Sequence, residues 1–212
     1  MKPVHFVIII ILAAISVACS GLEPQSSPTG ILYSDDFSST DTDWDQYSDA
    51  TYTADYFNGA YRITVNMESS NVWANPGNES FTDVRVEVDA TMNGGSEDNE
   101  FGVICRYIDE DQLYYGAISS DGYYGSVKMT KDGGFLVGND NMLESNKIIQ
   151  GAATNHIRFD CIGSMLFLYV NDFLVDKQID SAYTVGNTGF IAGTFDTPGT
   201  DILFDNLVVY KP

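Results

Sequence analysis

Hydrophobic and polar residues alternate one by one along most of the chain after residue 30. Between residues 83 and 90 the odd positions are charged and the even positions are apolar, namely Val84, Val86, Val88 and Ala90. Successive side chains of a β-strand point to opposite faces, so this period of two indicates a strand with one buried face. Similar runs predict further strands at 54–57, 60–65, 100–108, 113–119, 123–129, 155–162, 165–171, 173–179, 189–195 and 201–210.

Short turn sequences separate these runs. Asn58-Gly59 and Asp121-Gly122 suit two-residue hairpin turns of type I′, in which both central residues need a positive φ. Such short links join antiparallel strands, because parallel neighbours need a long crossover. Many short strands with tight turns therefore predict an all-β fold, a two-sheet antiparallel sandwich or jelly roll over residues 30–212.

The first residues have the pattern of an export signal. A basic start is followed by an apolar run at 6–17 and then by Cys19. The run is shorter than the ~20 residues of a membrane-spanning helix, and it predicts a signal peptide at 1–18. The segment before Cys19 is similar to a bacterial lipoprotein signal, which implies a lipid on Cys19, although Ser16 stands where Leu is usual. Ordinary cleavage, which leaves Cys19 as a spare thiol, is the alternative.

Residues 19–29 are rich in Ser, Pro and Gly and show no period, which predicts a flexible tether. We expect an exported cell-envelope protein that meets the membrane through its lipid anchor only, because an acidic body is repelled by anionic lipid.

The excess of acidic over basic residues excludes one class of binding partner. Thirty acidic residues against ten basic ones give a net charge of −20. Nucleic-acid binding needs a basic face, so we expect no nucleic-acid partner. Two His and three Cys also leave too few ligands for a His/Cys zinc centre.

Cys105 and Cys161 are the pair that remains once Cys19 is set apart. Each lies on the apolar side of its predicted strand, so both point to a core. In an exported domain this favours a disulfide, which stabilises a loop of this length by about 4 kcal/mol. Two separate buried thiols are the alternative.

Several segments in order resemble one family of domains. They are Asp35-Asp36-Phe37 with Trp44, then 58–63, Phe101-Gly102-Val103-Ile104-Cys105-Arg106-Tyr107, 114–119, Leu168-Tyr169-Val170-Asn171 and 204–209. They are similar to bacterial laminin-G-like, concanavalin-A-like jelly rolls, which occur in exported lipoproteins and beside enzymes that act on sugars. The resemblance covers residues 30–212. It implies two curved sheets, adjacent first and last strands and a concave face for a ligand, but it says little about function.

Glu87-Val88-Asp89 is similar to part of a catalytic motif on this type of fold. In glycoside hydrolase family sixteen, Glu-x-Asp-x-x-Glu supplies nucleophile, helper and acid/base, and Met92 stands here in place of the second Glu. A retaining mechanism needs two carboxyl groups about 5 Å apart. We therefore predict no catalytic residue from this motif, although Glu100 or 109–111 could complete a pair. A solvated strand face is the alternative.

The resemblance also implies one structural Ca²⁺ beside the first and last strands. Asp35, Asp36 and Asp205 would be its side-chain ligands, with backbone carbonyls near Asn58-Gly59, because calcium prefers such oxygens. Ordinary turn and strand-edge aspartates are the alternative.

Aromatic residues gather around the central hairpins beside polar side chains. The predicted ligand-binding set is Trp73, Tyr107, Tyr114, Tyr115, Tyr123 and Tyr124, with Asn75, Asn99 and Arg106. Aromatic rings stack on the C–H faces of sugars while polar groups take the hydroxyls. Alternation lets only one tyrosine of each adjacent pair face a ligand, and cross-strand packing is the alternative role.

These observations favour a non-catalytic module, anchored to the envelope, that binds a glycan or another envelope component on a concave aromatic face. A carbohydrate-active hydrolase with carboxylates from different strands is the second hypothesis. A structural or protein-interaction lipoprotein is the third.

Overall fold

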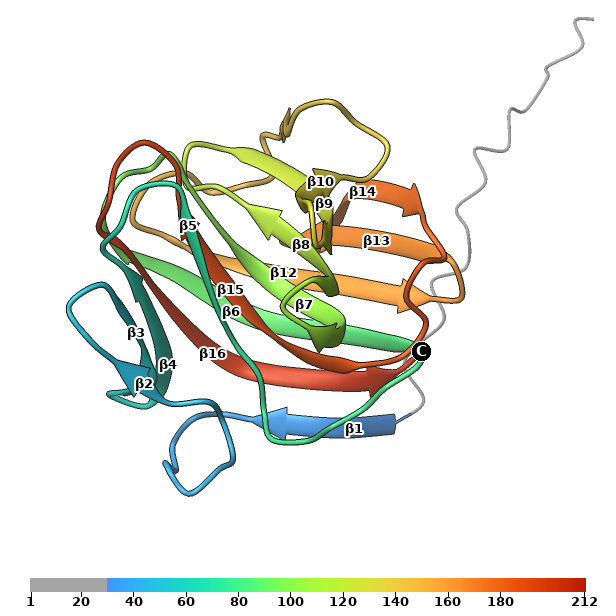
Figure 1. The fold of residues 1–212 in the computed structure, drawn as a ribbon, viewed down its shortest axis with the longest axis horizontal. Coiled ribbons are helices and arrows are strands. Elements are labelled where there is room, and N and C mark those ends of the chain that lie inside the picture. The colour runs from blue at the N-terminus through green and yellow to red at the C-terminus, as the bar shows by residue number, and fades with distance from the viewer. Residues whose placement is uncertain (1–29) are drawn as a thin grey trace, which may run out of the picture.

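A computed structural model describes residues 30–212 as two packed antiparallel sheets (Figure 1). Every helix or strand element in this part is a strand, and every strand pair is antiparallel. The predicted all-β sandwich is therefore confirmed. The predicted signal peptide, the lipidated Cys19 and the tether lie outside the described residues. Residues 30–212 contain no helix long and apolar enough to cross a membrane.

The larger sheet has nine strands in the order β14-β13-β12-β6-β16-β4-β3-β2, with β1 also paired to β16. The strands are β1 (Gly30–Asp35), β2 (Tyr47–Ser48), β3 (Tyr52–Phe57), β4 (Ala60–Val65), β6 (Val84–Gly94), β12 (Thr154–Ile162), β13 (Met165–Val170), β14 (Phe173–Ile179) and β16 (Thr200–Lys211). The first and last strands are neighbours, as the resemblance implied, and β1 (blue) runs beside β16 (red) in Figure 1.

The smaller sheet has seven strands in the order β10-β9-β8-β7-β15-β5, with β11 also paired to β9. The strands are β5 (Ser70–Ala74), β7 (Asn99–Asp109), β8 (Gln112–Ile118), β9 (Tyr123–Thr130), β10 (Gly133–Leu136), β11 (Leu143–Glu144) and β15 (Asn187–Thr194).

One predicted turn is confirmed and one is corrected. Asn58 and Gly59 both have positive φ, 53° and 80°, and they link β3 to β4. The link between β8 and β9 covers residues 119–122, and there only Gly122 has a positive φ. Asp121-Gly122 is therefore part of a longer turn. Within it the Ser119 hydroxyl donates to the Asp121 carboxylate and accepts from the backbone N–H of Tyr123.

The core lies between the two sheets and is built from the inward side chains of both. Phe190 of β15 and Phe204 of β16 stack across it, with ring centroids 4.3 Å apart. Cys105 of β7 and Cys161 of β12 form a disulfide that ties one sheet to the other across a sequence separation of 56 residues. The predicted cysteine pair is thus confirmed.

Candidate functional site

Two adjoining hollows lie along the seven-stranded sheet, one at its β5 edge and one on its outer face. On β5, Val72 and Ala74 point into the core, so Asn71 and Trp73 point outward. On β7 and β8 the same alternation turns Glu100 and Tyr115 outward. These four outward side chains come from three strands and line the two hollows.

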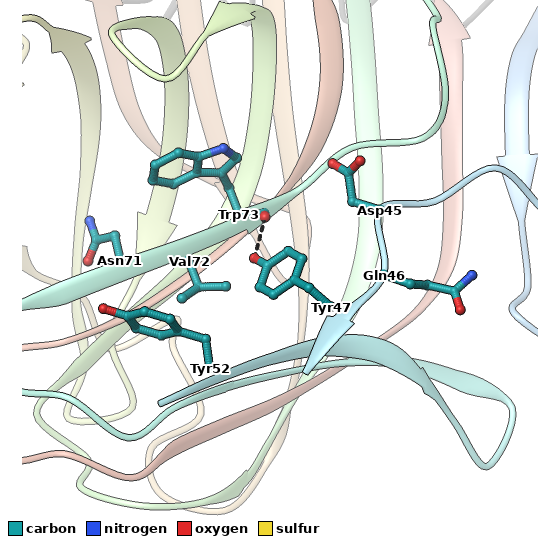
Figure 2. A pocket seen from close by; sticks show the side chains of 7 residues that line it. All are labelled: Asp45, Gln46, Tyr47, Tyr52, Asn71, Val72 and Trp73. Carbon is teal, nitrogen blue, oxygen red and sulfur yellow. Dashed lines mark hydrogen bonds between the residues drawn. The ribbon is translucent and has the colours of Figure 1, made fainter. Parts of the chain in front are cut away.

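The aromatic hollow lies at the β5 edge (Figure 2) and has a volume of about 470 Å³. It is lined by Asp45, Gln46, Tyr47, Tyr52, Asn71, Val72 and Trp73. Three of these residues, Tyr47, Tyr52 and Trp73, are aromatic, and Tyr47 and Tyr52 come from β2 and β3 of the other sheet. The Tyr47 hydroxyl donates to the Trp73 carbonyl oxygen at 2.8 Å, which fixes β2 against β5.

Asp45 contributes a carboxylate to the aromatic hollow, and hydrogen bonds to Asn75 fix its position. Its Oδ2 accepts the backbone N–H of Asn75 at 3.0 Å, and its own N–H donates to the Asn75 carbonyl at 3.1 Å. The segment before β2 is therefore tied to the end of β5 by a reciprocal pair of hydrogen bonds. This places a carboxylate and the Gln46 and Asn71 amides beside the three aromatic rings.

The glutamate hollow, of about 300 Å³, adjoins the aromatic hollow. It is lined by Asn71, Glu100, Tyr115, Val127, Met129, Gly134, Leu136, Met142 and Phe195. Asn71 lines both hollows, so they meet at this side chain.

Glu100 is a buried carboxyl group in the wall of the glutamate hollow. Its Oε1 accepts from Asn71 Nδ2 at 2.7 Å, and its Oε2 accepts from the Tyr115 hydroxyl at 3.4 Å. Burial raises the pKa of Glu100 above its ordinary value of 4.5, against the opposing effect of these two hydrogen bonds. Gly193 lies between β5 and β7 here. A Cβ on it would come within 2.1 Å of Asn71 Oδ1 and 3.0 Å of Glu100 Cγ, so glycine makes room for the pair.

The raised pKa makes the folded state bind the Glu100 proton more tightly than the unfolded chain does. Its contribution to stability is therefore full below pH 4.5 and is lost as pH rises through the raised folded-state value. Glu100→Gln cannot ionise, so we expect its stability relative to the original protein to increase as pH rises. Urea unfolding of both proteins from about pH 4 to about pH 8 measures this. A stability difference that stays constant over that range would contradict the prediction.

The structure corrects the predicted ligand-binding role of several buried residues. Tyr114 is fully buried in the core, where its hydroxyl donates to Asp180 Oδ1 at 2.5 Å. Arg106 is also buried, and its guanidinium donates to the backbone carbonyls of Thr82 and Tyr183. These polar groups serve the fold, because their partners lie within the protein.

Asn75 and Asn99 need the same correction. The Nδ2 of buried Asn75 donates to the Thr188 carbonyl, and that of buried Asn99 donates to the Ser96 carbonyl and to Ser120 Oγ. Both amides hold the chain around the strand ends.

The remaining aromatic residues divide between the two faces as alternation predicted. Tyr124 packs against the core with Tyr114, and it is not on the ligand face. Tyr115 points outward into the glutamate hollow, and Tyr123 is exposed on the outer side. Half-buried Tyr107 packs with the outward cluster that includes Trp73 but lines neither hollow.

Glu87-Val88-Asp89, the segment similar to part of a hydrolase motif, lies on the opposite side of the sandwich. Val86 and Val88 point into the core, so Glu87 and Asp89 face outward from the nine-stranded sheet. There His156 Nδ1 lies 2.8 Å from Asp89 Oδ1, and His156 Nε2 lies 3.9 Å from Glu87 Oε2. Glu100 lines a hollow on the other sheet, so these carboxylates do not complete a pair with it.

The three aspartates proposed as calcium ligands have partners within the protein. Asp35 accepts the Phe37 N–H at 2.8 Å and the Trp44 indole N–H at 3.1 Å. Asp36 accepts from Ser38, and Asp205 accepts the N–H of Asn206. Among residues 30–212 no group of three or more His, Cys, Asp or Glu side chains is placed to hold a metal ion. Asp35, Asp36 and Asp205 are therefore not brought together as one group of three carboxylates. Calcium binding stays a prediction, which melting with and without a chelator tests.

Comparison with known proteins supports the fold. No protein-family model and no curated protein matches the sequence. Among solved structures, the carbohydrate binding module CBM66 from Bacillus subtilis has a TM-score of 0.64 at 16% identity, covering 80% of this chain and 96% of that one. A protein of unknown function with a galectin-like fold, also from Bacillus subtilis, has a TM-score of 0.62 at 11% identity, covering 87% and 97%.

A glycoside hydrolase has the same type of domain within a longer chain. The GH43 BlXynB protein from Bacillus licheniformis has a TM-score of 0.60 at 10% identity, covering 84% of this chain and 39% of that chain. At such identities the likeness concerns the jelly-roll fold alone, because one fold carries many functions.

Proposed function

We propose that this domain binds carbohydrate in the aromatic hollow and does not cleave it. The observation that carries the proposal is the grouping of three aromatic rings with a carboxylate and two amides around one hollow of about 470 Å³. Aromatic rings stack on the C–H faces of sugars, and the polar groups can bind the hydroxyls. A hollow of this size with few polar groups is typical of a small-molecule site. The carbohydrate binding module of similar fold supports this proposal.

A hydrolase is the second candidate, because Glu100 is a buried carboxyl group at a hollow and a GH43 protein has a similar fold. Two-carboxylate hydrolysis needs a partner carboxyl at about 5 to 9.5 Å. Glu100 is the only carboxylate among the described residues that line the glutamate hollow, and Glu87 and Asp89 face away on the other sheet. Asp45 lines the adjoining aromatic hollow, where its carboxylate is held by the backbone N–H of Asn75. This arrangement favours binding over hydrolysis.

Trp73→Ala is expected to weaken glycan binding at least about thirtyfold, because loss of a central aromatic residue from an interface costs about 2 kcal/mol or more. The measurement uses an array of neutral homo-oligosaccharides of glucose, galactose, mannose, xylose and fructose, followed by calorimetry on the sugars that bind. Tyr123→Ala is the matched control, because Tyr123 is exposed on the same sheet and lines neither hollow. An array without binding, or equal affinity of Trp73→Ala and the original protein, would overturn the proposed function.

We also propose that the protein is exported and held at the cell envelope by a lipid on Cys19. The signal pattern of residues 1–18 supports this, and so does the Cys105–Cys161 disulfide, since disulfides persist in oxidising compartments. Cys19→Ser is expected to move the protein from the membrane fraction to the soluble fraction of lysed cells. Cys19→Ser protein that stays with the membrane would show that another feature anchors it.

A further inference from the structure

We propose that the two hollows form one groove, in which Glu100 and Asn71 bind a second sugar residue. The ligand is then an uncharged oligosaccharide of at least two units. This inference rests on the proposed function of the aromatic hollow, and it adds the length and charge of the ligand.

Asn71 is common to the linings of the two hollows, so they adjoin at this residue. Asn71 and Trp73 are alternate outward positions of β5, so they lie about 7 Å apart along the strand. A sugar stacked on Trp73 therefore has its neighbour in the oligosaccharide near Asn71. Gly193 then separates Asn71 from Glu100 in the same cross-strand row. The row leads from the aromatic hollow into the glutamate hollow.

The Glu100 carboxyl has capacity for a ligand. A carboxyl group offers about four acceptor positions, and two are used here, by Asn71 Nδ2 and the Tyr115 hydroxyl. The Asn71 amide and the Tyr115 hydroxyl fix its orientation, and Gly193 leaves the space that the Asn71 and Glu100 side chains occupy. A sugar hydroxyl that enters the glutamate hollow meets a positioned polar pair among apolar walls. This combination gives orientation and specificity in small-molecule sites.

The charges around the groove select against acidic sugars. None of the described residues that line either hollow is basic, whereas Asp45 and Glu100 both carry carboxyl groups. The chain as a whole has a net charge of −20. A glycan with carboxylate or sulfate groups would be repelled, so the groove favours uncharged units.

The test is the dependence of affinity on oligosaccharide length, measured on the full chain by calorimetry and, for the weak monosaccharide, by saturation-transfer NMR. The probes are sugars of one to six units from each neutral homo-oligosaccharide series used on the array. We expect affinity to rise at least tenfold from one unit to two. A disaccharide of the same linkage with one uronic acid is expected to bind at least tenfold more weakly than the neutral one.

Two variants separate the second hollow from the first. Glu100→Ala removes the polar contact, and Leu136→Trp fills the glutamate hollow without removing any polar group. Each is expected to abolish the gain from one unit to two. Leu136→Trp is also expected to leave monosaccharide affinity unchanged, because Leu136 does not line the aromatic hollow. Phe135→Trp is the matched control for Leu136→Trp, because Phe135 is the preceding residue of β10, is exposed and lines neither hollow.

The outcomes distinguish this inference from the proposed function. A monosaccharide that binds as tightly as the longer probes would overturn the two-unit groove and leave the aromatic hollow as a sugar site. The same conclusion follows if Leu136→Trp keeps the full gain with length. Equal affinity for the uronic acid disaccharide would overturn the charge selection. If no probe of any length binds, the proposed function and this inference both fail.

Discussion

Replacing both Cys105 and Cys161 by alanine is expected to lower the free energy of unfolding by about 4 kcal/mol. The disulfide joins β7 of one sheet to β12 of the other over a separation of 56 residues, so it restricts the unfolded chain over a long loop. Both cysteines are fully buried in the core, and alanine also leaves a small cavity there. For a domain of this size the melting temperature should fall by roughly 8 to 16 °C.

Thermal and urea unfolding of the original protein and of the double alanine variant, each with and without a reducing agent, measure this effect. The original protein should lose stability when it is reduced, whereas the variant should not respond to the reducing agent. A count of free thiols after unfolding verifies the state of each sample. An original protein that is fully reduced and melts at its usual temperature would show that the bond does not stabilise the fold.

The fold was predictable because its signal is local. Alternation between apolar and charged residues fixes which face of β6 is buried, and all four predicted core positions at 84–90 are buried in the structure. The Asn58-Gly59 turn was predictable for a similar reason, because positive φ at both positions favours these two residue types. The 119–122 turn was not, because its length depends on side-chain hydrogen bonds from Ser119.

The aromatic hollow was predictable only in part. Trp73 was identified as a candidate because it is one of the aromatic residues that gather around the central hairpins. Tyr47 and Tyr52 were not, because they belong to β2 and β3 of the other sheet. The folded arrangement brings residues 45–52 beside β5, and no spacing within either segment records that contact.

The burial of the charged residue Glu100 could not be predicted from the sequence either. The sequence suggested it only as an unplaced carboxylate. Its burial depends on neighbours from three other strands, including Asn71 on β5, Gly193 on β15 and Tyr115 on β8. In the sequence Glu100 is a single polar position on a largely apolar strand face. Such a position does not reveal whether the side chain is exposed to solvent or buried.

Arg106 shows where alternation itself misleads. A regular strand would turn its side chain away from the core, opposite to Cys105. The pairing of β7 with β8 shifts register after Cys105, and Arg106 has a φ of 55°. This β-bulge re-aims the side chain inward, because the extra residue interrupts the alternation. The predicted ligand-binding arginine is therefore a buried structural residue.

Arg106→Met is accordingly expected to lower the free energy of unfolding by about 3 kcal/mol. The guanidinium is 1% exposed and donates to the Thr82 carbonyl at 3.3 Å and the Tyr183 carbonyl at 2.9 Å. Methionine has a similar length but no donor, and each buried acceptor left unpaired costs about 1 to 3 kcal/mol. The ion pair with Asp83 adds little, because that carboxylate is half exposed.

Arg62→Met is the matched control, because Arg62 pairs with Asp201 at a more exposed site and its loss should cost about 1 kcal/mol or less. Urea unfolding compares the two variants. Glycan affinity gives a second measurement, because Arg106 lines neither hollow and Arg106→Met should bind sugar as the original protein does at temperatures where it is folded. Equal losses of stability in the two variants would contradict the structural role of Arg106. A selective loss of sugar binding in Arg106→Met would show that Arg106 belongs to the ligand site.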